Sequence, residues 1–306
     1  LVLTDLVLAL LLVRMRQGER PHPLNAPKLE DTPALADFGL AVDIFPYVLN
    51  AYFPEDFDLA RSGCRYQVYR RWESQGKNRP SFFLASDDTL GSVVIAIRGT
   101  MDIADWLTNL EADAVLINPD DRRGWRVHSG MLQAARYVHA EVVQSGELDR
   151  ALQTARTQRL IVAGHSMGAG VAAVLCALLR DKFPHCRCIG FGTPAVFSRD
   201  AAKALAPAVT SVIVDKDVVP RLSLHSCMAL RTELVAALTH CKSSKWVVIL
   251  RCLRGTATTD NSLSENELPM TASEDSPLLF TTPQSFTTGG GRISMLLTAR
   301  LSGAGS

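Results

Sequence analysis

The chain has 306 residues, of which 47% are hydrophobic and 21% charged, so it holds enough apolar material for a sizeable buried core. Its formal net charge is +1, and no block of lysine and arginine stands out that could neutralise a run of phosphates. These values indicate a globular protein and argue against a nucleic-acid partner.

Residues 1–16 form an apolar N-terminal segment that ends in Arg14 and Arg16. Its apolar run, Leu1 to Val13, is shorter than the ~20 residues that a membrane-spanning helix needs. The positive charges follow the run, whereas in a signal peptide they precede it. Two alternatives stay open: a helix that packs on the domain, or a membrane-facing segment left from a span. Because the chain opens with leucine, we expect a fragment or a processed product.

Residues 17–34 are polar and contain prolines, which predicts a linker. From Leu35 to about Leu253, apolar strands alternate with helical stretches. This alternation predicts a mostly parallel sheet covered by helices on both faces. We expect strands at 65–70, 82–85, 92–97, 160–163, 189–191, 211–214 and 246–250, and helices at 131–143, 169–180 and 229–239.

The composition changes beyond Arg254. Residues 255–288 are rich in Ser, Thr, Asp, Glu and Pro. Such a segment buries too little apolar surface to offset its ordering entropy, which predicts a disordered loop. A short apolar run from Ile293 to Leu297 then predicts a weak final strand. The expected organisation is an N-terminal segment (1–16), a linker (17–34), an α/β domain (35–253) and a divergent or truncated tail (254–306).

The segment Gly164-His165-Ser166-Met167-Gly168 is the strongest indication of function. It fits the G-x-S-x-G nucleophile elbow, in which a serine occupies a sharp turn between a strand and a helix. The predicted strand 160–163 and helix 169–180 supply that context, which a chance Gly-Ser-Gly turn would lack. We therefore predict that Ser166 is a nucleophile.

A serine hydroxyl needs a base, usually a histidine that a carboxylate orients. In this arrangement the carboxylate follows the serine along the chain and the histidine comes last. Asp217 follows the predicted strand 211–214, at the rim where the elbow also lies. Asp215 is the alternative, and we favour Asp217.

Two backbone N–H groups must also face the negative charge that develops on the acyl oxygen. The residue after the nucleophile, Met167, supplies one of them. The loop Arg98-Gly99-Thr100 ends the predicted strand 92–97, and Thr100 would supply the other. Taken alone, this tripeptide is an ordinary strand-ending turn.

Further motifs accompany these residues, in the order Asp105-Trp106-Leu107-Thr108-Asn109-Leu110, Val127-His128-Ser129-Gly130-Met131 and Asp217-Val218-Val219-Pro220-Arg221-Leu222. With the elbow and the Arg98-Gly99-Thr100 loop, they resemble the class 3 (fungal-type) lipases, and within them the sn-1-specific diacylglycerol lipases. The resemblance runs from about Phe38 to Leu253.

The resemblance implies an α/β-hydrolase fold and hydrolysis of a lipid acyl ester through an acyl-serine intermediate. It implies that Ser166 and Asp217 belong to a triad and that Thr100 and Met167 are oxyanion donors. Members of the family often carry an acidic residue where Asn109 stands, although an amide can also hydrogen-bond. Trp106 suits either a lid or the buried core.

The expected histidine is missing. No histidine follows His240, and where the family has a segment resembling Gly-Arg-x-x-His, this chain reads Gly291-Arg292-Ile293-Ser294-Met295. His225 and His240 follow Asp217 but precede the predicted last strand. Three explanations remain: a truncated or mis-spliced end, which we favour; a substitute base; or a catalytically silent relative.

The leading hypothesis is a membrane-associated lipase that faces the cytoplasm and acts on diacylglycerol or a related glycerolipid. The alternatives are a non-catalytic lipid-binding or scaffolding protein, a phospholipase A1 and another esterase. The reaction needs no cofactor. Seven scattered cysteines indicate reduced thiols. Cys186 and Cys188 beside His185 are only a weak indication of metal, and no metal site is expected. The sequence says nothing about oligomeric state.

Overall fold

The computed structural model describes residues 33–55, 59, 65–76, 78–99, 114–120, 122–214, 217–222, 224–239, 247, 284–288 and 291–296. The chain divides into two units. One comprises Ala26–Leu222 and Pro277–Ser306 and contains the sheet, and the other comprises Leu1–Asn25 and Ser223–Ser276 and contains helix α8 (Leu224–Thr239).

The strands of the main sheet are β1 (Tyr66–Trp72), β2 (Phe82–Asp87), β3 (Ser92–Ile97), β6 (Leu160–His165), β7 (Arg187–Phe191), β8 (Val209–Val214), β9 (Gln284–Thr288) and β10 (Gly291–Leu296). The helices of the same unit are α2 (Pro33–Tyr52), α4 (Ser129–His139), α5 (Glu147–Thr154), α6 (Met167–Leu179) and α7 (Arg199–Leu205), with short turns η2 (Ala140–Gln144) and η3 (Val219–Arg221). β4 (Ala114–Leu116) and β5 (Arg126–His128) form a separate two-stranded ladder.

The strand order is β1-β2-β3-β6-β7-β8-β10-β9. The central strands β3, β6, β7 and β8 are parallel, and the strands on either side of them pair antiparallel. Helices connect the parallel strands, as crossovers between parallel neighbours require. The predicted α/β-hydrolase architecture is therefore confirmed, with a parallel centre and antiparallel edges.

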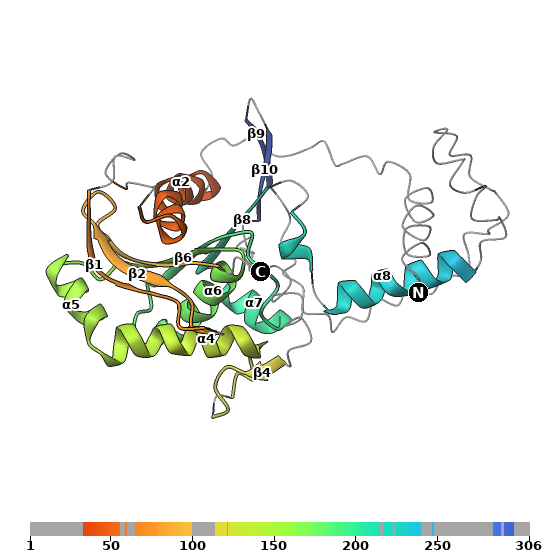
Figure 1. Ribbon diagram of the computed structural model, residues 1–306, viewed down its shortest axis with the longest axis horizontal. Coiled ribbons are helices and arrows are strands. Elements are labelled where there is room, and N and C mark those ends of the chain that lie inside the picture. Colours follow the sequence, from red (N-terminus) through yellow and green to blue (C-terminus); the bar gives the residue numbers. More distant parts are fainter. Residues whose placement is uncertain are drawn as a thin grey trace, which may run out of the picture. The chain divides into compact units, whose positions relative to one another are not determined.

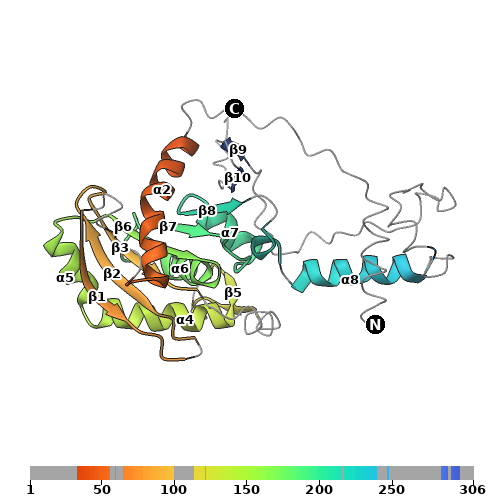
Figure 2. The same ribbon diagram turned by 45° about the horizontal axis from the view of Figure 1, so that its top comes forward.

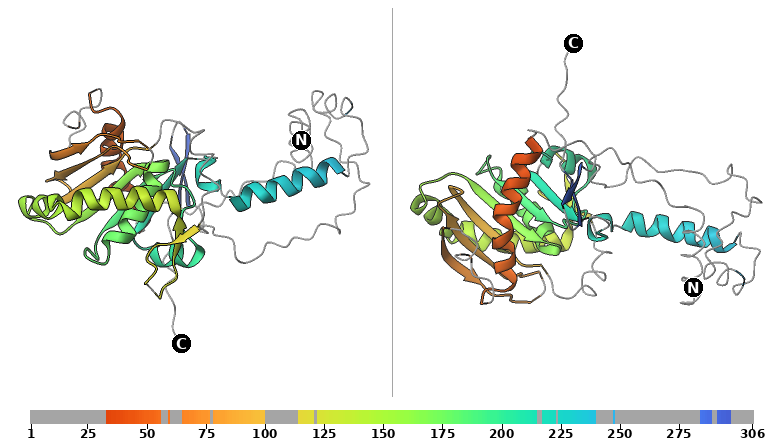
Figure 3. Two further views of the ribbon diagram at one scale, coloured as in Figure 1. Left: turned by 60° about the horizontal axis from the view of Figure 1, so that its bottom comes forward. Right: turned by 90° about the horizontal axis from the view of Figure 1, so that it is seen from above.

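The two faces of the sheet pack against different helices. Figure 1 shows α2 on one side of the sheet and α4 and α6 on the other. In Figure 2 α2 crosses the sheet, and the two views of Figure 3 bring first α4 and then α2 forward. Because strand residues alternate between faces, Phe83 and Val94 pack with α2, while Phe82 and Ile95 pack with α4 and α6.

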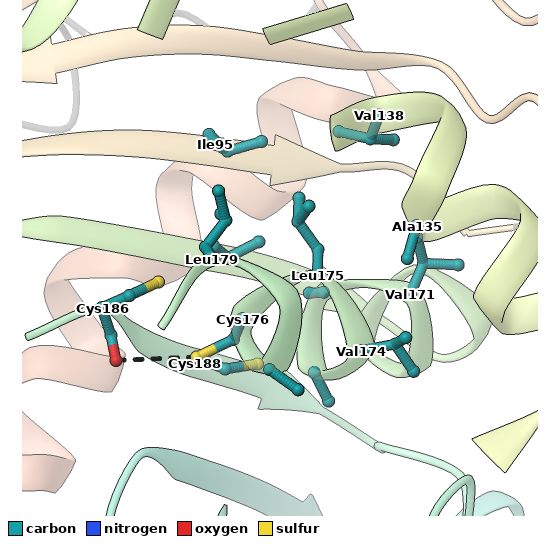
Figure 4. Packing of buried hydrophobic residues seen from close by; sticks show 14 of the residues in the cluster. Ile95, Ala135, Val138, Val171, Val174, Leu175, Cys176, Leu179, Cys186 and Cys188 are labelled. Atoms are coloured by element: carbon teal, nitrogen blue, oxygen red, sulfur yellow. Dashed lines mark hydrogen bonds between the residues drawn. The ribbon is translucent and has the colours of Figure 1, made fainter. Parts of the chain in front are cut away.

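The core between the sheet, α4 and α6 is the larger one (Figure 4). α6 is buried along nearly its whole length and contributes Val171, Leu175 and Leu179. Fully burying one such side chain stabilises a fold by about 1.5–3 kcal/mol. This packing fixes the helix that starts directly after Ser166, so the position of the elbow depends on it.

Polar contacts attach α2 to the strands beneath it. The Tyr47 hydroxyl, fully buried, donates to the Asp87 carboxylate over 2.5 Å. The same carboxylate accepts the N–H groups of Thr89 and Leu90 in the turn between β2 and β3. At its N-terminal turn, α2 contributes Asp37, which pairs with Arg187 of β7 over 2.6 Å. The helix is thus bonded to two different strands.

Several expectations need correction. The linker was expected to end at residue 34, but α2 begins at Pro33, a residue suited to a first helical turn. Residues 284–288 were expected in a loop and form β9. The predicted strand 246–250 lies outside the described residues except for Val247, which is helical. The run after the glycines does form a strand, β10, and it pairs with β8.

Residues 1–16, expected as a packed or membrane-facing segment, lie outside the described residues. Of the helices that the structure describes, none combines the length and apolar character needed to cross a bilayer.

We predict that Tyr47→Phe destabilises the protein more than Tyr69→Phe. The first change removes a bond to a buried carboxylate, worth about 1.5–3 kcal/mol, and the second removes a neutral, partly buried bond to Ser86, worth about 0.5–1.5 kcal/mol. Urea unfolding of both variants measures the difference. If Tyr47→Phe loses no more unfolding free energy than Tyr69→Phe, the bond between Tyr47 and Asp87 does not contribute the expected stability.

Candidate active site

Ser166 occupies the sharp turn between β6 and α6. Its backbone has φ 53° and ψ −125°, a conformation that non-glycine residues rarely adopt. The Ser166 N–H donates to the Phe191 carbonyl over 2.8 Å, and the Ser166 carbonyl accepts the N–H groups of Ala169 and Gly170. The turn is therefore bonded to the neighbouring strand on one side and to the new helix on the other.

The two glycines of the motif are required by close backbone contact. A Cβ at Gly164 would lie 2.5 Å from the Gly168 carbonyl oxygen and 2.8 Å from the Ala169 nitrogen. A Cβ at Gly168 would lie 2.5 Å from the Ile97 carbonyl oxygen and 2.8 Å from the Gly99 nitrogen. A side chain at either position would collide with the backbone of a neighbouring helix or strand, so only glycine fits at both.

These contacts also place the loop after β3 beside the elbow. Gly99 is buried, and a Cβ there would lie 2.6 Å from the His165 carbonyl oxygen. Thr100 itself lies outside the described residues. Met167, the other expected oxyanion donor, is the first residue of α6, where backbone N–H groups have no partner inside the helix. Gly99, the residue before Thr100, and Met167 therefore both lie close to Ser166.

Asp217 follows β8 and is half-buried. One carboxylate oxygen accepts the Val219 N–H over 3.0 Å, and the other lies 2.8 Å from the position that a Cβ of Gly192 would occupy. Gly192 has φ +60°, a conformation that favours glycine. The absence of a side chain there also leaves space for the Asp217 carboxylate. The neighbour of Gly192, Phe191, bonds Ser166, so one short segment touches both the elbow and Asp217. Asp215, the rival carboxylate, lies outside the described residues.

His165 lies directly before Ser166 in the sequence, and the charge of Asp217 affects its pKa. Partial burial of the ring lowers the pKa of His165, and the charge of Asp217 opposes that shift. The Nδ1 atom of His165 lies 3.2 Å from the Tyr52 hydroxyl.

His128 lies directly before α4 and caps it, with Nδ1 accepting the Met131 N–H over 3.3 Å. His225 lies in the first turn of α8, but its side chain lies outside the described residues, as does the whole of His240.

The sheet register locates Met295, the residue that stands where the resemblance predicts a histidine. Met295 of β10 pairs with Val212 of β8, Val212 with Phe191 of β7, and Phe191 with His165 of β6. The Met295 backbone thus lies level with the elbow but three strands away, roughly 14 Å at ~4.8 Å per strand.

The cysteines near residue 186 are part of the core. The Cys176 thiol donates to the Cys186 carbonyl over 3.6 Å, and Cys186 and Cys188 are buried beside it (Figure 4). A side-chain hydrogen bond with Cys176, together with burial, raises the pKa of the Cys186 thiol, and burial raises the pKa of the Cys188 thiol. Within the described part of the chain, no group of three or more His, Cys, Asp or Glu side chains could hold a metal.

Residues 94–226 match the protein family described as Lipase (class 3). The chain is 32% identical to diacylglycerol lipase-alpha of Rattus norvegicus over 237 residues, which cover 75% of this chain and 22% of that protein. It is 34% identical to diacylglycerol lipase-beta of Mus musculus over 171 residues, 55% of this chain and 26% of the relative. The chain thus spans roughly a quarter of the length of these relatives.

Among solved structures, a triacylglycerol lipase whose catalytic centre is a serine protease triad superposes with a TM-score of 0.54. It is 18% identical, and the superposition covers 62% of this chain and 76% of that one. At this identity the similarity supports the fold alone.

We predict opposite effects for two glycine-to-alanine changes. Gly168→Ala puts a Cβ into the backbone at the end of β3 and should destabilise the protein by more than about 2 kcal/mol. Gly39→Ala is the control, because a Cβ at this helical position of α2 meets no atom within 4 Å. It should stabilise by about 0.5–1 kcal/mol. Urea unfolding measures the stability of both variants. If Gly168→Ala is as stable as the original chain, the elbow is not packed as tightly as described.

Proposed function

This chain belongs to the class 3 lipase family, and we propose that it hydrolyses an acyl ester of a glycerolipid through an acyl intermediate on Ser166. The observation that carries the proposal is the backbone of Ser166, strained and bonded to β7, with the loop after β3 packed against it. Strain of this kind persists where the surrounding structure enforces it, which is common at catalytic residues.

Each part of the site has a role in the proposed reaction. The Ser166 oxygen attacks the ester carbonyl carbon while its proton passes to a base. The carbonyl oxygen becomes negative and is stabilised by the N–H groups of Met167 and Thr100. The carbon–oxygen bond to the glycerol oxygen breaks, and the alcohol leaves with the proton. Water then attacks the acyl-serine by the same steps, with Asp217 orienting the base throughout.

The substrate class follows from the relatives that bear the name diacylglycerol lipase. We propose diacylglycerol or a related glycerolipid as the substrate, with phospholipase A1 or another esterase activity as the alternative. Action on a lipid implies contact with a membrane surface, and free thiols at Cys176, Cys186, Cys188 and Cys227 fit a domain that faces the cytoplasm. No cofactor enters the reaction.

We also propose a hydrolase domain that differs from residues 35–253. It starts with α2 at Pro33, because α2 covers one face of the sheet. It includes residues 284–296, because β9 and β10 complete the sheet. Residues 223–276, which belong to the other unit, then interrupt the sequence of this domain.

A second function, lipid binding without catalysis, rests on Met295. A base must come within hydrogen-bond reach of the serine hydroxyl, and methionine cannot accept its proton. Without a triad member, only ~10³–10⁴-fold acceleration over water remains in a serine hydrolase.

We expect a fluorophosphonate probe to modify Ser166 of the intact chain and to leave Ser166→Ala unmodified. The serine oxygen attacks the phosphorus, the phosphorus–fluorine bond breaks, and fluoride leaves together with the serine proton. The phosphoryl oxygen takes the place of the acyl oxygen in the oxyanion hole. Mass spectrometry of the peptide with Ser166 measures the product. Correctly folded protein that stays unlabelled at Ser166 would overturn the proposal.

The base is tested by exchange of the tail. Replacing residues 284–306 with the matching segment of a relative that carries Gly-Arg-x-x-His should raise ester hydrolysis well above that of the original chain. In that hybrid, Asp217→Asn should lower the rate about 10⁴-fold, and Asp215→Asn should leave it unchanged.

A hybrid that folds, carries the histidine and still fails to hydrolyse esters would favour the non-catalytic function. Equal losses from the two aspartate variants would remove Asp217 from the site.

A further inference from the structure

Tyr52, the last residue of α2, lies between the loop after β3 and the nucleophile elbow. Its hydroxyl oxygen accepts the Gly99 N–H over 2.9 Å. The same hydroxyl lies 3.2 Å from the His165 Nδ1 atom and 3.4 Å from the His165 carbonyl oxygen. Either of these two atoms can accept a hydrogen bond from the hydroxyl. One side chain therefore bonds the residue before Thr100 and the residue before Ser166.

The Gly99 N–H depends on this bond. Gly99 is buried and lies two residues after the end of β3, so its N–H is removed from water just beyond the strand. A buried backbone donor needs an acceptor, and the Tyr52 oxygen provides it. The contact is close enough that a Cβ at Gly99 would collide with the Tyr52 hydroxyl oxygen.

The surroundings of Tyr52 keep its hydroxyl protonated and its ring in place. Burial raises the pKa of Tyr52, although the Gly99 N–H and the Arg98 charge act in the opposite direction. The Arg98 guanidinium lies 5.9 Å from the centre of the Tyr52 ring, and the His165 ring meets it edge-on at 5.8 Å. The neutral hydroxyl can accept one hydrogen bond and donate another at the same time.

We propose that Tyr52 is a positioning residue for the oxyanion hole, because it fixes the backbone at Gly99, the residue before Thr100, relative to Ser166. The proposal rests on the proposed function, since it assigns Tyr52 a part in that reaction. Tyr52 lies outside residues 94–226, the segment that matches the lipase family. Helix α2 therefore contributes to the catalytic apparatus as well as covering the sheet.

The mechanism is positional. An oxyanion donor stabilises the transition state only when it is held in place before the charge develops, and a shift of about 1 Å is enough to lower the rate 10²-fold. Without the Tyr52 hydroxyl, the Gly99 N–H loses its acceptor and the loop after β3 is free to shift. The ground-state contacts of the lipid would remain, so the loss should appear in the rate of reaction at Ser166.

The test compares Tyr52→Phe with Tyr69→Phe in the intact chain. Both variants lose one tyrosine hydroxyl, but Tyr69 bonds Ser86, on β2. The rate constant for fluorophosphonate modification of Ser166 should fall about 10- to 100-fold in Tyr52→Phe and stay within about twofold in Tyr69→Phe. Modification should reach the same final stoichiometry in both, because an unfolded fraction would lower the stoichiometry and a misplaced donor lowers only the rate.

Hydrogen exchange provides a readout that does not involve the reaction. The Gly99 amide should exchange faster in Tyr52→Phe while amides in the middle of β3 keep their protection. If Tyr52→Phe does not fold, 3,5-difluorotyrosine at position 52 closely keeps the shape of the ring. At a pH low enough to keep its more acidic hydroxyl protonated, the fluorines weaken the oxygen as an acceptor. This replacement should slow modification of Ser166 several-fold.

The outcomes are distinct. Equal modification rates for the original chain and a folded Tyr52 variant would overturn the positioning role and leave the proposed function intact. Unchanged exchange at Gly99 would overturn it as well. If the original chain is not modified at Ser166, the proposed function fails and the role of Tyr52 fails with it.

Discussion

The site depends on direct contact between backbone segments at three glycines. Gly164 packs against the first turn of α6, Gly168 against the end of β3, and Gly99 against the carbonyl of His165. A strand, a turn, a helix and a loop can approach so closely only where no Cβ intervenes. The strained backbone of Ser166 follows from this crowding, because the chain must reverse within a space that its neighbours already limit.

The ends of three parallel strands bring the remaining parts together. β6 ends at the elbow, β7 ends at Phe191 and Gly192, and β8 leads to Asp217. Side chains that follow parallel strands meet at one edge of a sheet, where α/β proteins generally bind their ligands. The α2 helix reaches the same edge with Tyr52, and its anchors at Asp87 and Arg187 lie elsewhere on the sheet.

The sequence predicted those parts that have a local signature. The β-branched run Ser92–Ile97 became β3 with the predicted bounds, and the glycine spacing around Ser166 identified the elbow. α2 was not predicted, because its residues combine an internal Pro46 with apolar residues around much of its surface. The bond between Tyr52 and His165 joins residues 113 positions apart, and such a contact leaves no pattern in either segment. The strand β9 lies in a stretch of polar residues, where pairing with β10 outweighs composition.

The pairing of β10 with β8 means that the chain leaves the sheet after η3 and returns to it with β9, having formed α8 in the other unit. The entropy cost of closing such an excursion rises only slowly, by about 0.6 kcal/mol for each doubling of its length. Evolution can therefore lengthen, shorten or replace this segment at small thermodynamic cost to the sheet. The length of this segment can therefore vary independently of the residues of the candidate site.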